Sequence, residues 1–328
     1  MTLNLKRQPP WLLDGTYYRS LPTNEERAGG EEAYRNCVVS LHVAKSDDGE
    51  SGEDGLTQVG TAFAVSVPDG EGNEFRYLIS TREVVRRCIR HGDLILRFST
   101  SDGGSLDVAT VPYDDWYPHP DPRTDIAAHP LQEVPAGVDL TPVPLEIALT
   151  DDLVSSQHVG TGDSLFSVGQ FEPHPQNSGP RPLISNGKVY LMPQLVATRL
   201  AGPDSAFIEV EGYLAEWRLW AGASGSPVFR YSPSNTSVSG SHIYLLGVVH
   251  SHMNADERQA MSEVLVRGDA HEEYGLAVVV PAQRVREVLE TGPLAQARDE
   301  AIEDIIIGRM ESERMAAFEE LVLTEEAR

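Results

Sequence analysis

The alternation of hydrophobic and polar residues predicts short β-strands separated by turns over most of the chain. In the first half, the pattern predicts strands at residues 37–44, 58–67, 75–80, 94–98, 106–111 and 125–128. A short helical segment is expected at 81–90, and a proline-rich loop at 113–123. Strands of this length and spacing are typical of an all-β barrel or sandwich.

A second set of strands follows residues 136–160, which we interpret as an interdomain linker. These strands are expected at residues 164–168, 183–192, 206–210, 227–231, 243–250 and 275–280. Pro281 then begins a C-terminal helix over 282–290, because proline is favoured at the first helical position. The pattern therefore predicts two β-barrels, the first at 34–135 and the second, with its helix, at 161–292.

The two ends of the chain have a different character. Residues 1–33 are rich in Pro, Gly and Glu without a sustained period, which predicts an N-terminal extension on the surface. Residues 293–328 carry apolar residues near helical spacing, which predicts a helical tail of one helix, or of two with a break near Gly308. The apolar stripe of this tail either packs on the barrel or binds a protein partner. We expect the β body to fold without residues 294–328.

The amino-acid composition and charge argue against several classes of function. The net charge of −24 argues against nucleic-acid binding, which needs clustered Lys and Arg. The hydrophobic runs are too short for a membrane span or a signal peptide, so we expect a soluble, acidic, cytoplasmic protein. Cys37 and Cys88 lack the spacing of metal ligands and are expected to be buried free thiols. We expect neither a metal nor another cofactor.

One stretch contains a candidate nucleophile. Ser224 lies in the sequence Gly222-Ala223-Ser224-Gly225-Ser226-Pro227, directly before an apolar strand. Because Gly222 has no side chain, the backbone can turn so that the amides of Gly222 and Ser224 face one developing oxyanion. Glycine and serine are equally common in tight turns, so this pattern alone allows a reactive serine or an ordinary turn.

Several segments together resemble a known family, the trypsin-like serine peptidases of chymotrypsin fold. In chain order, the matching segments are residues 60–65, 77–85, 124–127, 222–227 and 246–249, within a resemblance that spans 34–290. The resemblance implies a chymotrypsin-like double β-barrel with Asp125 as the acid of the triad and Ser224 as its nucleophile. It also implies an oxyanion hole made by Gly222 and Ser224. Glu83 stands where the family has its histidine.

The substitution at Glu83 changes the function that the resemblance implies. Serine attack needs a neutral base that takes a proton and returns it to the leaving group, and a carboxylate is a poor substitute. If Glu83 faced Asp125, one of the two carboxyl groups would be expected to hold a proton. We therefore expect a pseudoprotease without ordinary peptidase activity, which binds a peptide or protein partner by strand addition or through the tail.

An alternative is an active serine endopeptidase with a non-standard base. In the family, the strand at residues 246–249 ends beside the triad acid, so an imidazole at His250 could contact Asp125 and reach towards Ser224. The alternative is that His250 fills space left by the changed site or points along the substrate groove. His252 has the same strand parity and a weaker claim. A rearrangement of the site during activation would also allow an active endopeptidase. The remaining histidines near these motifs are expected on loops or the surface: His91, His119 and His129.

Two further positions bear on specificity and activation. Arg218, six residues before Ser224, resembles the base of the primary specificity pocket, where a buried cation would favour acidic side chains. An arginine on the surface is the alternative. Ala223 stands where trypsin-type enzymes have the acidic residue that pairs with a newly cleaved N-terminus. Activation by insertion of such a terminus is therefore not expected.

Overall fold

The computed structural model of the chain describes eleven stretches of residues. They are 33–44, 55–70, 72–131, 134–156, 159–171, 181–199, 207–217, 220, 222–232, 242–252 and 275–326. The extension expected at 1–33 lies outside the described residues except for its last position. Over the described residues, two β units are followed by two C-terminal helices, so the expected all-β class with a C-terminal helix and a helical tail is confirmed.

The first β unit is an eight-stranded sheet with the order β5-β4-β1-β2-β3-β7-β6, and β8 pairs with β2. Its strands are β1 (Val38–Ala44), β2 (Leu56–Pro68), β3 (Glu74–Ser80), β4 (Leu94–Ser99), β5 (Ser105–Val111), β6 (Tyr117–Pro118), β7 (Ala127–Pro130) and β8 (Val143–Pro144). Short helices α1 (Arg82–Arg86), α2 (Cys88–His91) and η3 (Tyr113–Asp115) lie in its connections. The strands expected from the pattern are present, with β6 and β8 in addition.

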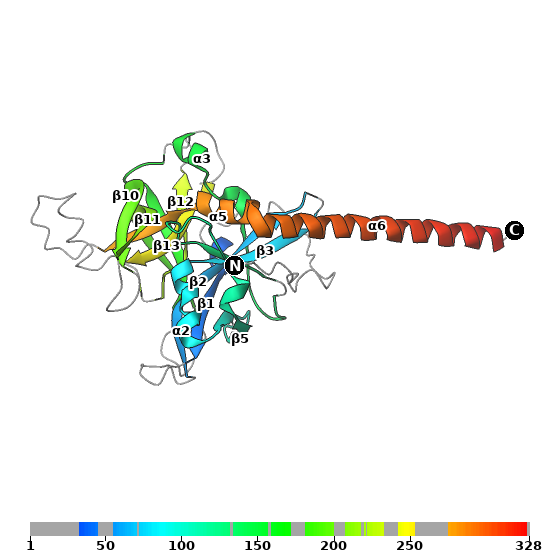
Figure 1. Ribbon diagram of the computed structural model, residues 1–328, viewed down its shortest axis with the longest axis horizontal. Coiled ribbons are helices and arrows are strands. Elements are labelled where there is room, and N and C mark those ends of the chain that lie inside the picture. Colours follow the sequence, from blue (N-terminus) through cyan, green and yellow to red (C-terminus); the bar gives the residue numbers. More distant parts are fainter. Residues whose placement is uncertain are drawn as a thin grey trace, which may run out of the picture.

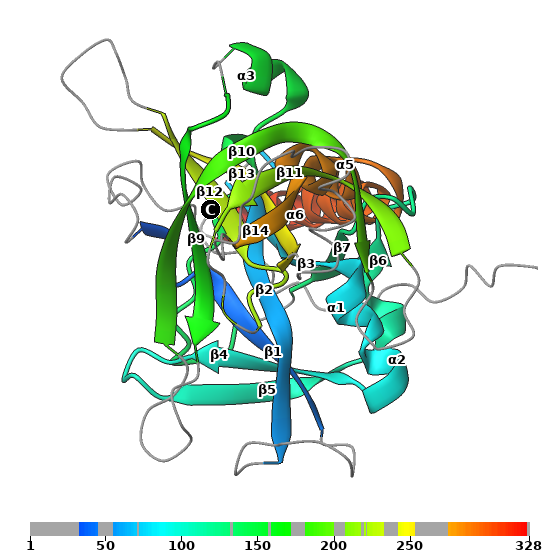
Figure 2. The same ribbon diagram turned by 90° about the vertical axis from the view of Figure 1, so that its left-hand side faces the viewer.

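The second β unit is a closed barrel with the order β10-β11-β14-β13-β12-β9. Its strands are β9 (Ser164–Phe171), β10 (Arg181–Arg199), β11 (Phe207–Glu216), β12 (Pro227–Ser232), β13 (His242–His252) and β14 (Leu276–Pro281). Figure 2 shows this barrel above the strands of the first unit. In both units the fourth long strand returns to pair with the first, β4 with β1 and β12 with β9, so each unit begins with a Greek key.

The connection between the units is part of the folded core. It contains β8, η4 (Leu145–Ile147) and α3 (Asp151–Ser156). Val143 of β8 pairs in parallel with Val65 of β2, and Leu145 and Ala148 are buried. Residues 136–160, which the pattern predicts as a linker, therefore contribute side chains to the interior.

The two units share one hydrophobic cluster. Phe63 of the first unit belongs to the same cluster as Phe166 and Phe229 of the barrel, whose rings stack with their centroids 4.9 Å apart. Leu289, from the helix that follows the barrel, completes this cluster. Because interiors pack as densely as organic crystals, a common core holds the two units at a fixed separation.

Two helices end the chain, α5 (Ala282–Glu290) and α6 (Gly292–Glu326), and α6 continues through Gly308 without a break. Leu294 is buried, and Arg298 donates a hydrogen bond to the carbonyl oxygen of Leu289 at 2.8 Å. From Ile306 to Ala316 every residue of α6 is exposed. Figure 1 shows the helix as a rod that leaves the body. Within the described ranges, no helix is long and apolar enough to span a membrane.

The cysteines are buried and free, which confirms the expectation for both. Burial raises the pKa of the Cys37 thiol far above its ordinary value and that of Cys88 to about 11. Both groups are therefore protonated thiols at neutral pH, which are poor nucleophiles.

Candidate active site

Ser224 lies half-buried in a tight turn directly before β12. The amide of Ala223 donates to the oxygen of Trp220 at 3.2 Å, and that of Ser226 donates to Ala223 at 2.9 Å. Gly225 has a φ of +91°, and a Cβ atom there would lie 1.9 Å from the carbonyl oxygen of Thr61. Only glycine fits this position, because both the left-handed backbone and the close approach of β2 exclude a side chain.

The first β unit holds this turn in place. The amide of Thr61 donates to the carbonyl oxygen of Ser224 at 2.8 Å, and its hydroxyl donates to Gly222 at 2.8 Å. The amide of Gly225 donates to Val249 of β13 at 2.8 Å. Among the described residues, neither the amides of Gly222 and Ser224 nor the Ser224 hydroxyl makes a hydrogen bond. Both amides are therefore available to a carbonyl or anionic oxygen.

Asp125 is buried in the loop between β6 and β7, and each of its carboxylate oxygens has a partner. Oδ1 accepts a hydrogen bond from the backbone amide of Glu83 at 2.9 Å. Oδ2 contacts Nδ1 of His250. This carboxylate therefore links the start of α1, in the first unit, to the end of β13, in the barrel.

Glu83 lies in the first turn of α1, whose N-cap is Thr81. The Thr81 hydroxyl accepts a hydrogen bond from the amide of Val84 at 3.2 Å, which fixes where this helix begins. Val84 packs on Gly60, where a Cβ atom would lie 2.5 Å from Val84 Cγ1 and 3.0 Å from the carbonyl oxygen of Ser224. Residue 83 thus lies in the first turn of a short helix that binds Asp125, and Gly60 lies between Val84 of this helix and the carbonyl oxygen of Ser224.

His250 is 3% exposed, and its imidazole is oriented by Asp125. Its second nitrogen, Nε2, is buried and has no hydrogen-bond partner among the described residues. In this arrangement, His250 contacts the acid of the site and makes no hydrogen bond with Ser224. The contact with Asp125 orients the imidazole for proton transfer, but Ser224 is not bound to it.

Comparison with known proteins gives similarity to solved structures only. No protein-family model and no curated protein matches the chain. The MamO protease domain from Magnetospirillum magneticum (apo form) is 16% identical, with 79% of this chain and 98% of that chain covered and a TM-score of 0.41. The active form of Rv3671c protease from M. tuberculosis is 14% identical, with 89% and 96% covered and a TM-score of 0.42.

The fold is assigned from the strand order within the chain. Two antiparallel units that each begin with a Greek key share a core, and a helix follows the second. This strand order is that of a chymotrypsin-like double β-barrel, in which the second unit is a closed barrel and the first is an eight-stranded sheet over the described residues. The candidate residues Ser224 and Asp125 lie where its two units meet, since Thr61 of the first unit binds Ser224, and Asp125 of the first unit contacts His250 of the barrel.

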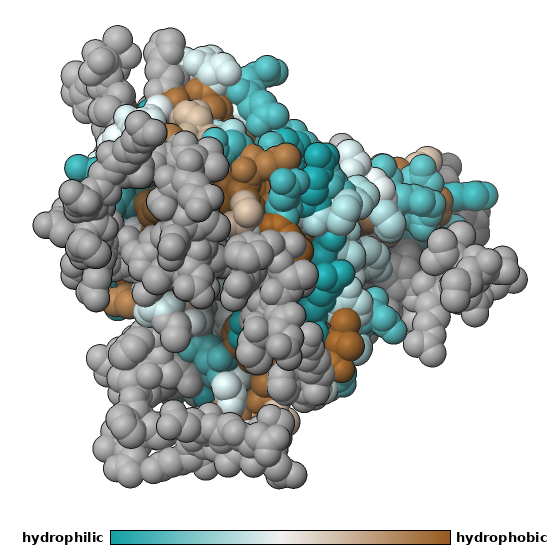
Figure 3. All heavy atoms as spheres, turned by 60° about the vertical axis from the view of Figure 1, so that its left-hand side comes forward, coloured by the Kyte–Doolittle hydropathy of each residue, from teal (hydrophilic) through white to brown (hydrophobic). Residues whose placement is uncertain are grey.

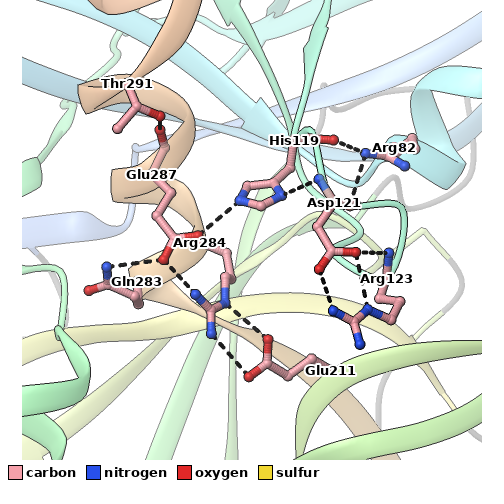
Figure 4. A network of polar contacts seen from close by, with 9 residues as sticks. All are labelled: Arg82, His119, Asp121, Arg123, Glu211, Gln283, Arg284, Glu287 and Thr291. Carbon is pink, nitrogen blue, oxygen red and sulfur yellow. Dashed lines mark hydrogen bonds and ion pairs between the residues drawn. The ribbon is translucent and has the colours of Figure 1, made fainter.

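A network of polar contacts braces the loop that carries Asp125 (Figure 4). His119, expected on a loop or the surface, lies in a loop and is only 7% exposed. Its Nδ1 accepts a hydrogen bond from the amide of Asp121 at 3.1 Å, and its Nε2 contacts Glu287 Oε2 at 2.9 Å. Arg82 donates to the carbonyl oxygens of His119 and Asp121.

The same network reaches helix α5 and the barrel. Arg284 of α5 donates two hydrogen bonds to Glu211 of β11, at 3.0 and 3.1 Å, and also binds Glu287. A pocket of about 440 Å³ lies among these side chains and those of Asp121 and Arg123. The sequence gives no sign of this network, because its members come from separate elements and His119 and Glu287 are 168 positions apart.

Of the remaining candidates, only His129 has a described side chain. His129 is half-buried, and its Nδ1 lies 3.0 Å from the carbonyl oxygen of Asp115. The side chains of His91 and His252 are not described, and Arg218 lies outside the described residues. Over the described part of the chain, no group of three or more His, Cys, Asp or Glu side chains is placed to hold a metal ion.

Proposed function

We propose that this chain is a pseudoprotease of the trypsin-like type, which lacks ordinary peptidase activity and binds an extended peptide or protein segment. The contact that carries the proposal is the hydrogen bond from the Glu83 amide to Asp125. It places residue 83 next to the acid of the site, where a triad requires a base that is neutral at working pH. Loss of a triad member costs up to about a millionfold in turnover.

The edge of β13 supports peptide binding. Gly247 and Val248 pair with both β12 and β14, but among the described strands Ser251 and His252 pair with β14 alone. An extended segment can add to the unpaired edge by main-chain hydrogen bonds, next to the Ser224 turn. The amides of Gly222 and Ser224 would then donate hydrogen bonds to one of its carbonyl oxygens.

A second candidate function is an active serine endopeptidase, which the His250–Asp125 contact favours. In that case a movement of the imidazole or of the Ser224 turn would bring Nε2 to the serine hydroxyl. His250 would act as the base in place of a histidine at residue 83, oriented by the same acid. The two functions differ in whether Ser224 is ever activated.

Labelling with a fluorophosphonate probe separates these functions, because the probe reacts only with an activated serine. The proposal predicts that the wild type and Ser224→Ala show the same background labelling at every pH tested. Labelling that is lost in Ser224→Ala and in His250→Ala, but kept in Glu83→Gln, would overturn it in favour of the endopeptidase. Trypsin labelled in the same buffer serves as the positive control.

A further inference from the structure

His119 is a buried ionisable side chain in the loop that leads to Asp125. Ionisable side chains ordinarily lie on the surface, as on the face in Figure 3, where the described hydrophobic residues form small separate groups between hydrophilic ones. His119 is instead 7% exposed. It lies at the neck of the loop, because its backbone amide donates to the carbonyl oxygen of Ile126 at 2.9 Å. A change at His119 can therefore pass along the loop to Asp125.

The two ring nitrogens of His119 have partners of opposite kinds. The backbone amide of Asp121 donates to Nδ1 at 3.1 Å, so Nδ1 carries no proton. Nε2 lies 2.9 Å from a carboxylate oxygen of Glu287, whose pKa is lowered below its ordinary value. An ionised carboxylate can only accept, so Nε2 carries the proton. With both hydrogen bonds formed, as Figure 4 shows them, the imidazole is neutral.

A second proton on this ring breaks the hydrogen bond at Nδ1. An imidazolium ring has a donor at each nitrogen, so its Nδ1–H would face the backbone N–H of Asp121. The contact with Glu287 would remain and become a charge-assisted hydrogen bond, which is stronger than a neutral one. Protonation therefore keeps the ring on α5 and deprives the Asp121 amide of its acceptor.

Charged groups of both signs surround the ring. Of the residue types present, only histidine ordinarily changes its charge between pH 5 and 8. Three carboxylates and three guanidinium groups of the described residues lie around His119, so the hydrogen bonds rather than the net charge distinguish its two forms. The loop itself contributes Asp121 and Arg123, α1 contributes Arg82, β11 contributes Glu211, and α5 contributes Arg284 and Glu287.

We propose that His119 is a positioning residue for Asp125, and that protonation of its imidazole loosens the loop at residues 119–125. In the neutral form, the ring ties the Asp121 amide to α5 and keeps the loop closed. Arg82 still donates to the carbonyl oxygens of His119 and Asp121 after protonation, so the loop loosens while the body stays folded. The inference goes beyond the proposed function, and it holds whether the site binds a peptide or cleaves one.

Hydrogen–deuterium exchange of the full chain at about pH 7.5 and about pH 5.5 tests the loosening. After correction for the intrinsic pH dependence of exchange, residues 119–126 should exchange about tenfold or more faster at the lower pH. His119→Asn should stay protected at both pH values, because its side-chain oxygen can accept from the Asp121 amide as in an Asx-turn and does not titrate. Equal protection of the wild type at both pH values would overturn the proposal.

A second histidine provides the matched control. Nδ1 of His129 lies 3.0 Å from a carbonyl oxygen, so it already donates there and a second proton displaces no donor. His129→Asn should therefore keep the wild-type response of residues 119–126. The same rise in exchange in His119→Asn as in the wild type would assign the effect to another group, such as His250, against the proposal.

Nitrogen-15 NMR of the imidazole rings tests the proposal on the wild type, without any variant. The His119 ring should carry no proton on Nδ1 at about pH 7.5, and its titration should share one midpoint with the shift of the Asp121 amide. A proton on Nδ1 at that pH, or an Asp121 amide that does not respond, would overturn the proposal. Neither this measurement nor the exchange experiment involves Ser224, so their outcome is distinct from that of the probe labelling.

Discussion

Nδ1 of His250 contacts the carboxylate of Asp125, although the two residues are 125 positions apart in the sequence. Both side chains are almost fully buried, at 2% and 7% exposure. The other carboxylate oxygen is held by the amide of Glu83, so Asp125 has a partner in each β unit. This pair therefore contributes to holding the units together, in addition to any role in chemistry.

Removal of either member of this pair should destabilise the fold. Asp125→Ala and His250→Ala are each expected to lower the free energy of unfolding by about 3 kcal/mol, because each leaves a buried polar group without its partner. The double variant should lose clearly less than the sum of the two. Urea unfolding of the four proteins gives this coupling, and strictly additive losses would show that the two side chains do not interact.

The turn at Ser224 should not tolerate a side chain at Gly225. Gly225→Ala places a Cβ atom against Thr61 at a backbone angle that alanine rarely adopts, so we expect a loss of about 2 kcal/mol or more in unfolding free energy. Gly308→Ala is the matched control, because a Cβ atom there has open space and alanine favours a helix. Equal stability of the Gly225 variant and the wild type would mean that the turn is not pinned against β2.

The network around His119 should make stability depend on pH through Glu287. Burial raises the pKa of this carboxyl group, but hydrogen bonds from His119 and Gln283 and the nearby Arg284 lower it, with a net pKa below the ordinary value of 4.5. A lowered folded-state pKa stabilises the fold above about pH 4.5, and this contribution is lost as the pH falls through the folded-state pKa.

Glu287→Gln should therefore cost about 1 kcal/mol near pH 7, and the difference from wild type should shrink below pH 4.5. Urea unfolding at a series of pH values measures it, with Glu303→Gln, at an exposed position on α6, as the control. A difference that stayed constant down to pH 3 would mean that the Glu287 carboxylate makes no favourable contact.

Two truncations should separate the halves of α6. A chain that ends at Ile305 keeps the buried turns and should unfold within about 0.5 kcal/mol of the full chain. A chain that ends at Gly292 still folds but loses Leu294 and Arg298, at a cost of about 2–4 kcal/mol. Thermal and urea unfolding provide the comparison. Equal stability of both truncations would show that the first turns of α6 are not part of the core.

The sequence predicted the fold where hydrophobic periodicity is strong. Most of the strands and the helix at 282–290 lie at or near the expected positions, because alternation and turn residues are local signals. Val143 and Leu145 were expected in a linker, and their burial depends on packing against strands far away in the sequence. Local composition carries no record of such contacts, so the β8 pairing was missed.

In the candidate site, too, features set by neighbouring residues could be predicted, but contacts between residues far apart in the sequence could not. The residue types of Ser224 and Gly225 alone predict a turn. The contact between His250 and Asp125 is one of the alternatives that the family resemblance left open for this histidine. The bracing of the Asp125 loop by Glu287 was not foreseen, and neither was the burial of His119, because an isolated histidine in a proline-rich segment gives no sign of its partner.

Turnover of a mixed peptide library by the wild type, Glu83→His and Glu83→Gln tests whether Glu83 is what deprives the site of peptidase activity. Ser224→Ala serves as the blank. A histidine at residue 83 can donate to Asp125 through one nitrogen and accept from Ser224 through the other. We expect Ser224-dependent cleavage by the histidine variant only, with the wild type and the glutamine variant at the level of the blank. Ser224-dependent cleavage by the wild type equal to that of Glu83→His would mean that another base already activates Ser224, against the proposed pseudoprotease.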